Sequence, residues 1–158
     1  MRFIGLDLGT KTLGVAVSDL TNIIASSLCI IRFSDNDYNS TYEPLKKIID
    51  EYKITNIVLG LPKNMNNSIG FRGEATLEYK KMLESWFNLE VELIDERLTT
   101  VEATNYMLEA NLSRKKRKKK IDSLAANIIL QTYLDKRGMN LWKMKLWHLK
   151  LLVMKVKR

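Results

Sequence analysis

The chain has 158 residues, of which 46% are apolar and 28% are charged. This length suits one domain of ordinary size and excludes both a pair of large domains and an α/β barrel, which needs roughly 250 residues. The single cysteine, Cys29, excludes an internal disulfide and a cysteine-based zinc site. Asp7 interrupts the only stretch where a signal peptide could lie, and no apolar run approaches the roughly 18 residues of a spanning helix. We therefore expect a soluble cytoplasmic protein without stable membrane association.

The net charge of +8 is concentrated in two segments. Seven basic residues form an unbroken run at 114–120, and six more follow Gly138, with no acid in either segment. The rest of the chain holds 13 basic and 18 acidic residues. A local basic run beside an acidic body suits a clamp for a polyanion next to a carboxylate site. A solvated charge run is the alternative interpretation.

The first third of the chain predicts strands. Short apolar, β-branched stretches are separated by the turn residues Gly-Thr-Lys-Thr, which is typical of a hairpin. Ser40 and Glu43 then have the spacing of a capping box, which predicts a helix to about residue 53. The predicted strands of this region are residues 3–8, 13–19 and 23–32.

The remaining elements alternate between strands and helices. Thr99 and Glu102 form a second capping box, which predicts a helix to about Asn111. Three meandering strands followed by strands joined through helices predict an α/β protein with a mixed sheet and helices packed on it. The later elements are strands at 56–61 and 89–95, a helix through Ala75 to Trp86, and a helix over 121–137.

Three carboxylates stand out by position. Asp7 lies inside the first strand with glycines on the same face, Glu96 directly follows the last strand, and Asp122 opens the last helix. Two strand positions and one helix start can converge at the carboxyl edge of such a sheet, where open α/β sheets place their sites. Oxygen ligands of this kind suit Mg²⁺ or Mn²⁺. A helix cap for Asp122 and a plain surface acid for Glu96 are the alternatives.

Four blocks of sequence occur in an order that resembles the YqgF family, also called RuvX, of ribonuclease H-like nucleases. The resemblance covers residues 1–138, and the blocks are DLGTKTLGVAVSD, GLPKNMNNSIGFRGEA, DERLTTVEA and IDSLAANIILQTYLD. It implies a ribonuclease H-like fold, here a mixed five-stranded sheet with helices on both faces, and metal-dependent cleavage of a nucleic-acid backbone. It also implies a role in processing the precursor of small-subunit ribosomal RNA.

The family's acidic positions fall on Asp7, Glu96 and Asp122, which the resemblance therefore implies to be catalytic and metal-binding. Two departures stand out. Asn66-Asn67 replaces the common Asp-Gly, and because asparagine tolerates a left-handed turn position we expect the loop shape to be kept. Asn127 replaces an apolar residue, and we expect it to face solvent.

Further residues are candidates for binding the phosphate backbone. Lys11 lies in the first hairpin turn, where it either contacts a phosphate or simply forms the turn. Arg97, next to Glu96, either positions a phosphate or pairs with an acid. The basic run ends just before the helix of Asp122, which favours a role in the clamp. Its members are Arg114, Lys115, Lys116, Arg117, Lys118, Lys119 and Lys120.

These features predict a nuclease domain over residues 1–138 that acts on structured nucleic acid. RNA is favoured over branched DNA, and ribosomal precursor particles are candidate partners. Three other functions are weighed: a Holliday-junction resolvase-like DNA nuclease, a non-catalytic RNA- or ribosome-binding factor, and an ATP-handling domain. The last is disfavoured because no second Asp-x-Gly hairpin occurs in residues 20–158.

Residues 139–158 lie beyond the resemblance and form a basic and aromatic C-terminal extension. Two of the three tryptophans and six cations occur in these twenty residues. Such a composition can serve RNA stacking or an anionic membrane surface. Neither a helical nor a strand period fits the segment well, so we expect a packed extension or a mobile tail.

Overall fold

The computed structural model describes residues 1–97 and 113–156, and within these ranges the side chains of residues 116–123, 142, 155 and 156 lie outside the described part. Five strands form one mixed sheet in the order β3-β2-β1-β4-β5. β1 pairs antiparallel with β2 and parallel with β4, and β5 pairs parallel with β4. The strands are β1 (Phe3–Leu8), β2 (Thr12–Ser18), β3 (Ala25–Arg32), β4 (Asn56–Leu61) and β5 (Glu90–Asp95).

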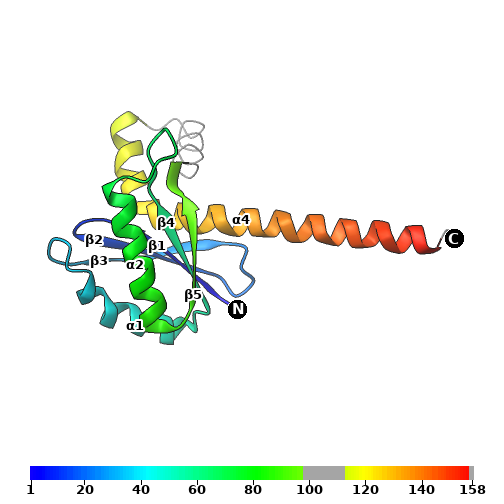
Figure 1. The fold of residues 1–158 in the computed structure, drawn as a ribbon, viewed down its shortest axis with the longest axis horizontal. Coiled ribbons are helices and arrows are strands. Elements are labelled where there is room, and N and C mark those ends of the chain that lie inside the picture. Colours follow the sequence, from blue (N-terminus) through cyan, green and yellow to red (C-terminus); the bar gives the residue numbers. More distant parts are fainter. Residues whose placement is uncertain (98–112, 157–158) are drawn as a thin grey trace.

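The described helices cover both faces of this sheet (Figure 1). A short 3-10 helix, η1, precedes α1, and α4 begins with the basic run. The mixed sheet with helices on both faces was predicted from the sequence and is confirmed. The helices are η1 (Tyr38–Thr41), α1 (Tyr42–Tyr52), α2 (Phe71–Phe87) and α4 (Arg114–Val156).

Strand alternation divides the core into two layers. In β1, Ile4, Leu6 and Leu8 pack with Leu45 of α1 and Leu83 of α2. The alternate residues of β1 face α4. There Phe3 of β1 and Val58 of β4 pack with Ile129, Leu130 and Leu134 in the second core cluster. Burial on both faces explains why β1 and β4 are almost continuously apolar in sequence.

The sheet and α4 approach each other closely through glycines. A Cβ at Gly5 would lie 2.6 Å from the Cβ of Leu130 and 3.0 Å from the carbonyl oxygen of Ala126. Gly5, two residues before the strand carboxylate, therefore makes room for a helix backbone.

Two local expectations were wrong. Ser40 does not cap α1: its hydroxyl donates to the carbonyl of Asp37, and the helix begins at Tyr42 without a side-chain cap. Asn127 does not simply face solvent, because it is half-buried and its amide donates to the carbonyl of Ala25 at 3.3 Å. The predicted helix over 121–137 also extends further, from Arg114 to Val156. The second capping box, at Thr99 and Glu102, lies outside the described residues.

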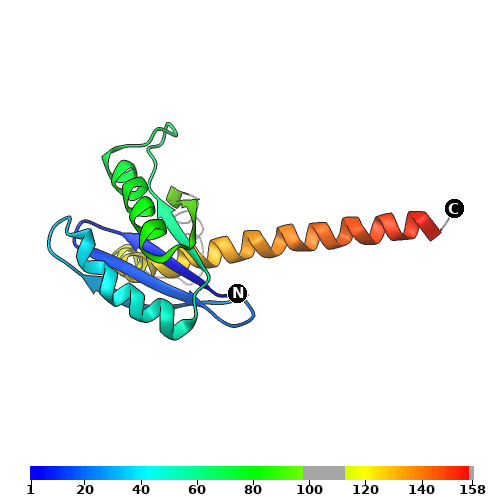
Figure 2. The same cartoon turned by 60° about the horizontal axis from the view of Figure 1, so that its bottom comes forward.

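Beyond Gly138, α4 continues as a straight rod that leaves the domain (Figures 1 and 2). In both views no other described element runs beside it. The expected domain boundary at residue 138 therefore falls inside one helix, and the division into a domain and an extension stays a prediction.

Candidate active site

Parallel pairing brings the carboxyl ends of three strands to one edge of the sheet. β1, β4 and β5 lie side by side and run in the same direction, so that Leu61 is level with Asp95. Asp7 stands near the end of β1, and Glu96 follows β5 directly. The topology therefore places both carboxylates at the edge where sheets of this kind hold their sites.

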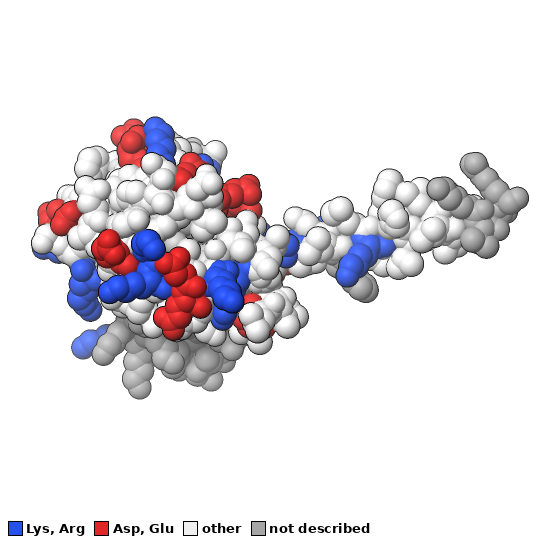
Figure 3. Space-filling model, turned by 90° about the horizontal axis from the view of Figure 1, so that it is seen from below, with Lys and Arg blue, Asp and Glu red and all other residues white. Residues whose placement is uncertain are grey.

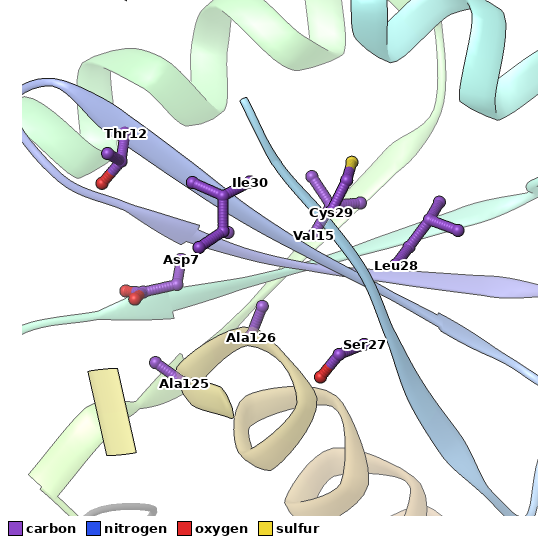
Figure 4. Close-up of a pocket in the computed structure, with 10 residues that line it drawn as sticks. Asp7, Thr12, Val15, Ser27, Leu28, Cys29, Ile30, Ala125 and Ala126 are labelled. Carbon is purple, nitrogen blue, oxygen red and sulfur yellow. The ribbon is translucent and has the colours of Figure 1, made fainter. Parts of the chain in front are cut away.

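Asp7 lies on the face of the sheet that α4 covers. Its partner across the β1–β2 ladder is Gly14, and a Cβ built on Gly14 would lie 3.6 Å from the Cβ of Asp7 and 3.3 Å from that of Ala126. Figure 4 shows Asp7 on the same side of the strands as Ala125 and Ala126. These residues line a cavity of about 170 Å³ that continues between β2, β3 and α4.

Glu96 reaches the same place from the other side of β4. A Cβ at Gly60 would lie 2.7 Å from Oε1 of Glu96 and 2.5 Å from Cδ1 of Ile129. Only a glycine in the middle strand leaves room for the Glu96 side chain to cross toward Asp7.

A hydrogen bond joins the two carboxyl groups. Burial of Glu96, the negative charge of Asp7 and a hydrogen bond between the two groups raise the pKa of Glu96 to about 7. Two adjacent carboxylates in a buried place disfavour a second negative charge. The site therefore has a raised affinity for a positive charge, of which the raised pKa of Glu96 is the sign.

Arg72 is a participant that was not identified from the sequence. Its guanidinium donates to the carbonyl of Leu8 at 3.3 Å, and its charge lowers the pKa of Glu96, opposing the effect of burial. Arg72 opens α2 two residues after Gly70, inside one of the four sequence blocks. The only available signal was its membership of that block.

The position of residue 122 follows from the path of α4. Tyr133 packs on Phe3 with ring centroids 5.4 Å apart, Leu130 lies against Gly5, and Ala126 lies against Gly14. Earlier residues of the helix therefore lie nearer to the end of β1 that carries Asp7. Residue 122 is one helical turn before Ala126, which brings its backbone toward this edge. The Asp122 side chain lies outside the described residues, among which no group of three potential metal-binding side chains occurs.

Arg97 pairs with an acid, which is one of its two expected roles. Its guanidinium contacts the carboxylate of Asp95 at 2.6 Å and lowers the pKa of that group. The same guanidinium donates to the carbonyl of Asn64 and to the side chain of Asn67, both at 3.0 Å. Arg97 thereby ties the loop after β4 to the end of β5.

Asn67 takes the left-handed turn position expected of it in the loop after β4, whereas retention of the family's loop shape stays a prediction. Asn67 has a φ of 68°, in the left-handed region that asparagine tolerates better than most residues. Its backbone N–H donates to the carbonyl of Asn64 at 2.9 Å, which closes the turn.

Three of the other candidate phosphate contacts are exposed. Lys11 lies in the turn between β1 and β2, three residues beyond Leu8. Arg114 and Lys115 open α4 and are also exposed. The backbone of the remaining run is helical, whereas the side chains of Lys116, Arg117, Lys118, Lys119 and Lys120 lie outside the described residues.

Comparison with known proteins agrees with this arrangement. The family model described as RuvX, Holliday junction resolvase, matches residues 1–136. The chain belongs to this family. A relative named "Putative pre-16S rRNA nuclease" from Oceanobacillus iheyensis is 52% identical over 137 residues, covering 87% of this chain and 100% of the relative. A relative of the same name from Enterococcus faecalis is 52% identical over 136 residues, covering 85% of this chain and 97% of the relative.

The fold of this RuvX-family chain is also found among solved structures. Thermus thermophilus RuvC, in complex with a Holliday junction substrate, superposes with a TM-score of 0.61. The two sequences are 14% identical, and the match covers 89% of this chain and 96% of RuvC. This likeness confirms the predicted ribonuclease H-like fold.

Proposed function

We propose that this RuvX-family protein is a divalent-metal-dependent nuclease that hydrolyses phosphodiester bonds in the precursor of small-subunit ribosomal RNA. The observation that carries the proposal is the hydrogen-bonded carboxyl pair of Asp7 and Glu96, held at the carboxyl edge of the sheet. The RNA substrate is inferred from the curated relatives, whose name specifies pre-16S rRNA.

The donor set at this edge fits a hard divalent cation. Asp7 and Glu96 offer only oxygen atoms, and burial together with their mutual repulsion already raises the affinity of the site for a proton. Asp7, Glu96 and Asp122 would hold Mg²⁺ or Mn²⁺ in place of that proton. When bound, the cation would favour attack by water on the phosphorus and stabilise the charge on the leaving oxygen.

The remaining residues of the edge have complementary roles. The positive charge of Arg72 partly offsets the negative charge of the carboxyl pair. Arg97 holds the neighbouring loop in place through Asp95 and Asn64. Lys11 lies in the turn that follows β1, the basic run opens α4, and these cations would hold the phosphate backbone by its charge. Arg97 already makes an ion pair with Asp95. We assign it a phosphate contact that it makes while this ion pair is kept.

Cleavage of a precursor rRNA fragment by the wild-type protein and by Asp7→Asn tests the proposal. We expect cleavage in Mg²⁺ or Mn²⁺, none in EDTA, and a loss of at least about 100-fold in the variant, because one charge of the metal site is removed. Asp50→Asn is the matched control, because Asp50 is an exposed acid of α1 that pairs with Lys46. It should cleave at the wild-type rate.

RNA binding measured on the same samples separates a nuclease from a non-catalytic binding factor. A nuclease loses turnover in Asp7→Asn while it still binds RNA. Tight binding by both proteins without cleavage by either would contradict the proposal and support a ribosome-binding factor.

A second candidate function follows from the description of the family. The family model is described as a Holliday junction resolvase, and the RuvC structure with TM-score 0.61 is a complex with such a junction. A four-way DNA junction of matched length, tested beside the RNA fragment, decides between them. Faster cleavage of the junction would replace the RNA assignment.

A further inference from the structure

The rod, defined here as residues 139–156 of α4, is the largest feature that the nuclease function leaves unexplained. It lies beyond the family match, which ends at residue 136, and beyond the body of the domain in Figures 1 and 2. None of the helices, over the described residues, is long and apolar enough to cross a bilayer.

The rod exposes an unusual amount of apolar surface. Ten of its large apolar side chains are between 37% and 68% exposed, among them Trp147 at 65% and Met154 at 66%. An apolar surface of this extent on a soluble protein marks a contact with another molecule or with a membrane.

These side chains point in all directions around the helix. Met139, Leu146, Leu149 and Val153 recur at intervals of three, four and seven residues along one side. At 3.6 residues per turn, Met144 and Leu151 fall on the opposite side, and Leu141 and Leu152 fall between. A partner that touches only one side of the rod therefore leaves apolar side chains of the other sides in water.

The charge of the rod has one sign. Its described charged side chains are Lys143, Lys145 and Lys150, all exposed, and its sequence contains no acid. Figure 3 shows blue lysines among white side chains along the rod beyond the domain. The partner must therefore combine negative charge with apolar material.

A second copy of the chain does not meet this requirement. The seam of Met139, Leu146, Leu149 and Val153 has the spacing of a coiled coil, but Lys143, Lys145 and Lys150 occupy the positions that flank it. Two rods packed through this seam would set lysine against lysine. Their repulsion opposes self-association.

Two other candidate partners satisfy only part of the requirement for negative charge and apolar material. One is a groove on an acidic protein, and the other is a nucleic acid. A groove covers one side of a helix, which leaves the apolar residues of the other sides in water. A nucleic acid pairs with lysines and stacks on Trp147, but it has no surface for the aliphatic side chains around Leu151 and Leu152. The interface of an anionic bilayer supplies both, because a helix lying in it buries its apolar side chains about 5–10 Å deep while its lysines reach back to the headgroups.

The domain adds apolar surface at the base of the rod. At the turn between β2 and β3, Leu20 is 81% exposed and Ile23 is 65% exposed. The Gln131 amide of α4 donates to the carbonyl of Ile23 at 2.9 Å, which fixes this turn against the helix that continues into the rod.

We propose that the rod is an interfacial anchor that docks this protein on membranes rich in anionic phospholipid. This inference is independent of the nuclease function. The sequence-based expectation of no stable membrane association considered spanning helices, whereas the anchor lies in the plane of the interface.

Co-sedimentation of the full chain with vesicles tests the anchor. Phosphatidylcholine vesicles are compared with vesicles that contain about 30% phosphatidylglycerol, and tryptophan emission is recorded. We expect binding to the anionic vesicles with a blue shift, and at least about 100-fold weaker binding to the neutral ones. Replacing Lys143, Lys145 and Lys150 by Gln should weaken binding about 100-fold, because each lysine contributes roughly fivefold near an anionic surface.

The matched control removes the same charge from the domain. Lys46, Lys47 and Lys53 are exposed on or beside α1, and their replacement by Gln should leave vesicle binding unchanged. A second rod variant, Leu149→Ser with Val153→Ser, should also abolish the blue shift while RNA cleavage in solution persists.

Three outcomes would overturn the anchor. The first is the absence of binding of the full chain to anionic vesicles. The second is equal loss of binding in the rod and control lysine variants. The third is concentration-dependent dimerisation that the serine variant removes without any effect on vesicle binding, which would assign the rod to a second copy.

Discussion

Glu96 couples the stability of this protein to pH because its carboxyl group is buried beside Asp7. Its pKa is about 7 in the folded chain and close to 4.5 in an unfolded one. The folded state therefore binds the proton more tightly, so protonation stabilises the metal-free protein below pH 4.5, and this stabilisation is lost as the pH rises toward 7.

We expect the metal-free protein to lose up to roughly 3 kcal/mol of stability between pH 4.5 and 7.5 through this group. Thermal melting in EDTA across this range measures the loss. Glu96→Gln should flatten the profile, because the amide cannot ionise, whereas Glu51→Gln on the exposed side of α1 should not. A profile of unchanged slope in Glu96→Gln would show that the carboxyl pair does not hold the proton.

Arg72 sets the position of this transition. Its charge opposes the rise in the pKa of Glu96, and its guanidinium holds the end of β1 through Leu8. In Arg72→Gln we expect the pH-dependent loss of metal-free stability to move to higher pH, with about 1 kcal/mol of overall destabilisation from the lost hydrogen bond. Arg72→Lys keeps the charge and should keep the midpoint. Thermal melting of both variants in EDTA, over the same pH range, measures the midpoint of this loss.

At the scale of elements, the contact between β1 and α4 positions the site. A methyl group at Gly5 would collide with the Cβ of Leu130 and with the backbone of Ala126. We expect Gly5→Ala to destabilise the protein by about 1–3 kcal/mol, because the helix must move away from the sheet. Since α4 also carries residue 122, cleavage should fall even at temperatures where the variant remains folded.

Gly138 of α4 provides the control for Gly5→Ala. Nothing lies within 4 Å of a Cβ built there, and the residue is helical and exposed. Gly138→Ala should be neutral or slightly stabilising, by up to about 1 kcal/mol, because alanine favours the helix. Chemical denaturation of the two variants gives the comparison. Equal effects at both glycines would exclude the close approach at Gly5 as the cause.

The strands could be predicted from the sequence because each carries its own signal. Runs such as residues 56–61 are β-branched, short and bounded by turn residues, and they lie in the sheet as expected. Asp7 and Glu96 could be selected for the same reason, since strand ends at one edge bring their neighbours together. Their hydrogen bond, by contrast, depends on the space left by Gly60, which no local pattern reports.

The helices were harder to delimit. Ser40 has a capping-box spacing but bonds within η1, because the chain had already turned helical at Tyr38. Periodicity could not reveal the rod, since apolar residues on every side of a helix produce no single face. The basic run carried no helical signal either, although it forms the first two turns of α4.

The molecule as a whole separates its charges. The basic run and the C-terminal segment hold 13 of the 26 basic residues, while the rest of the chain is net acidic. An acidic body repels RNA, so the proposed clamp at 114–120 should dominate the approach of the substrate to the site.

Replacing all seven cations of the run by Gln tests this division of charge. Glutamine keeps the helix propensity of α4, so the fold should persist while RNA affinity drops. The slope of log affinity against log salt should become shallower by about one unit for each phosphate contact that is lost. The triple variant of Lys46, Lys47 and Lys53 removes charge from α1 and should leave this slope unchanged. If the seven-residue variant keeps the wild-type slope, the run is a solvated surface and RNA reaches Asp7 and Glu96 by contacts elsewhere along the edge of the sheet.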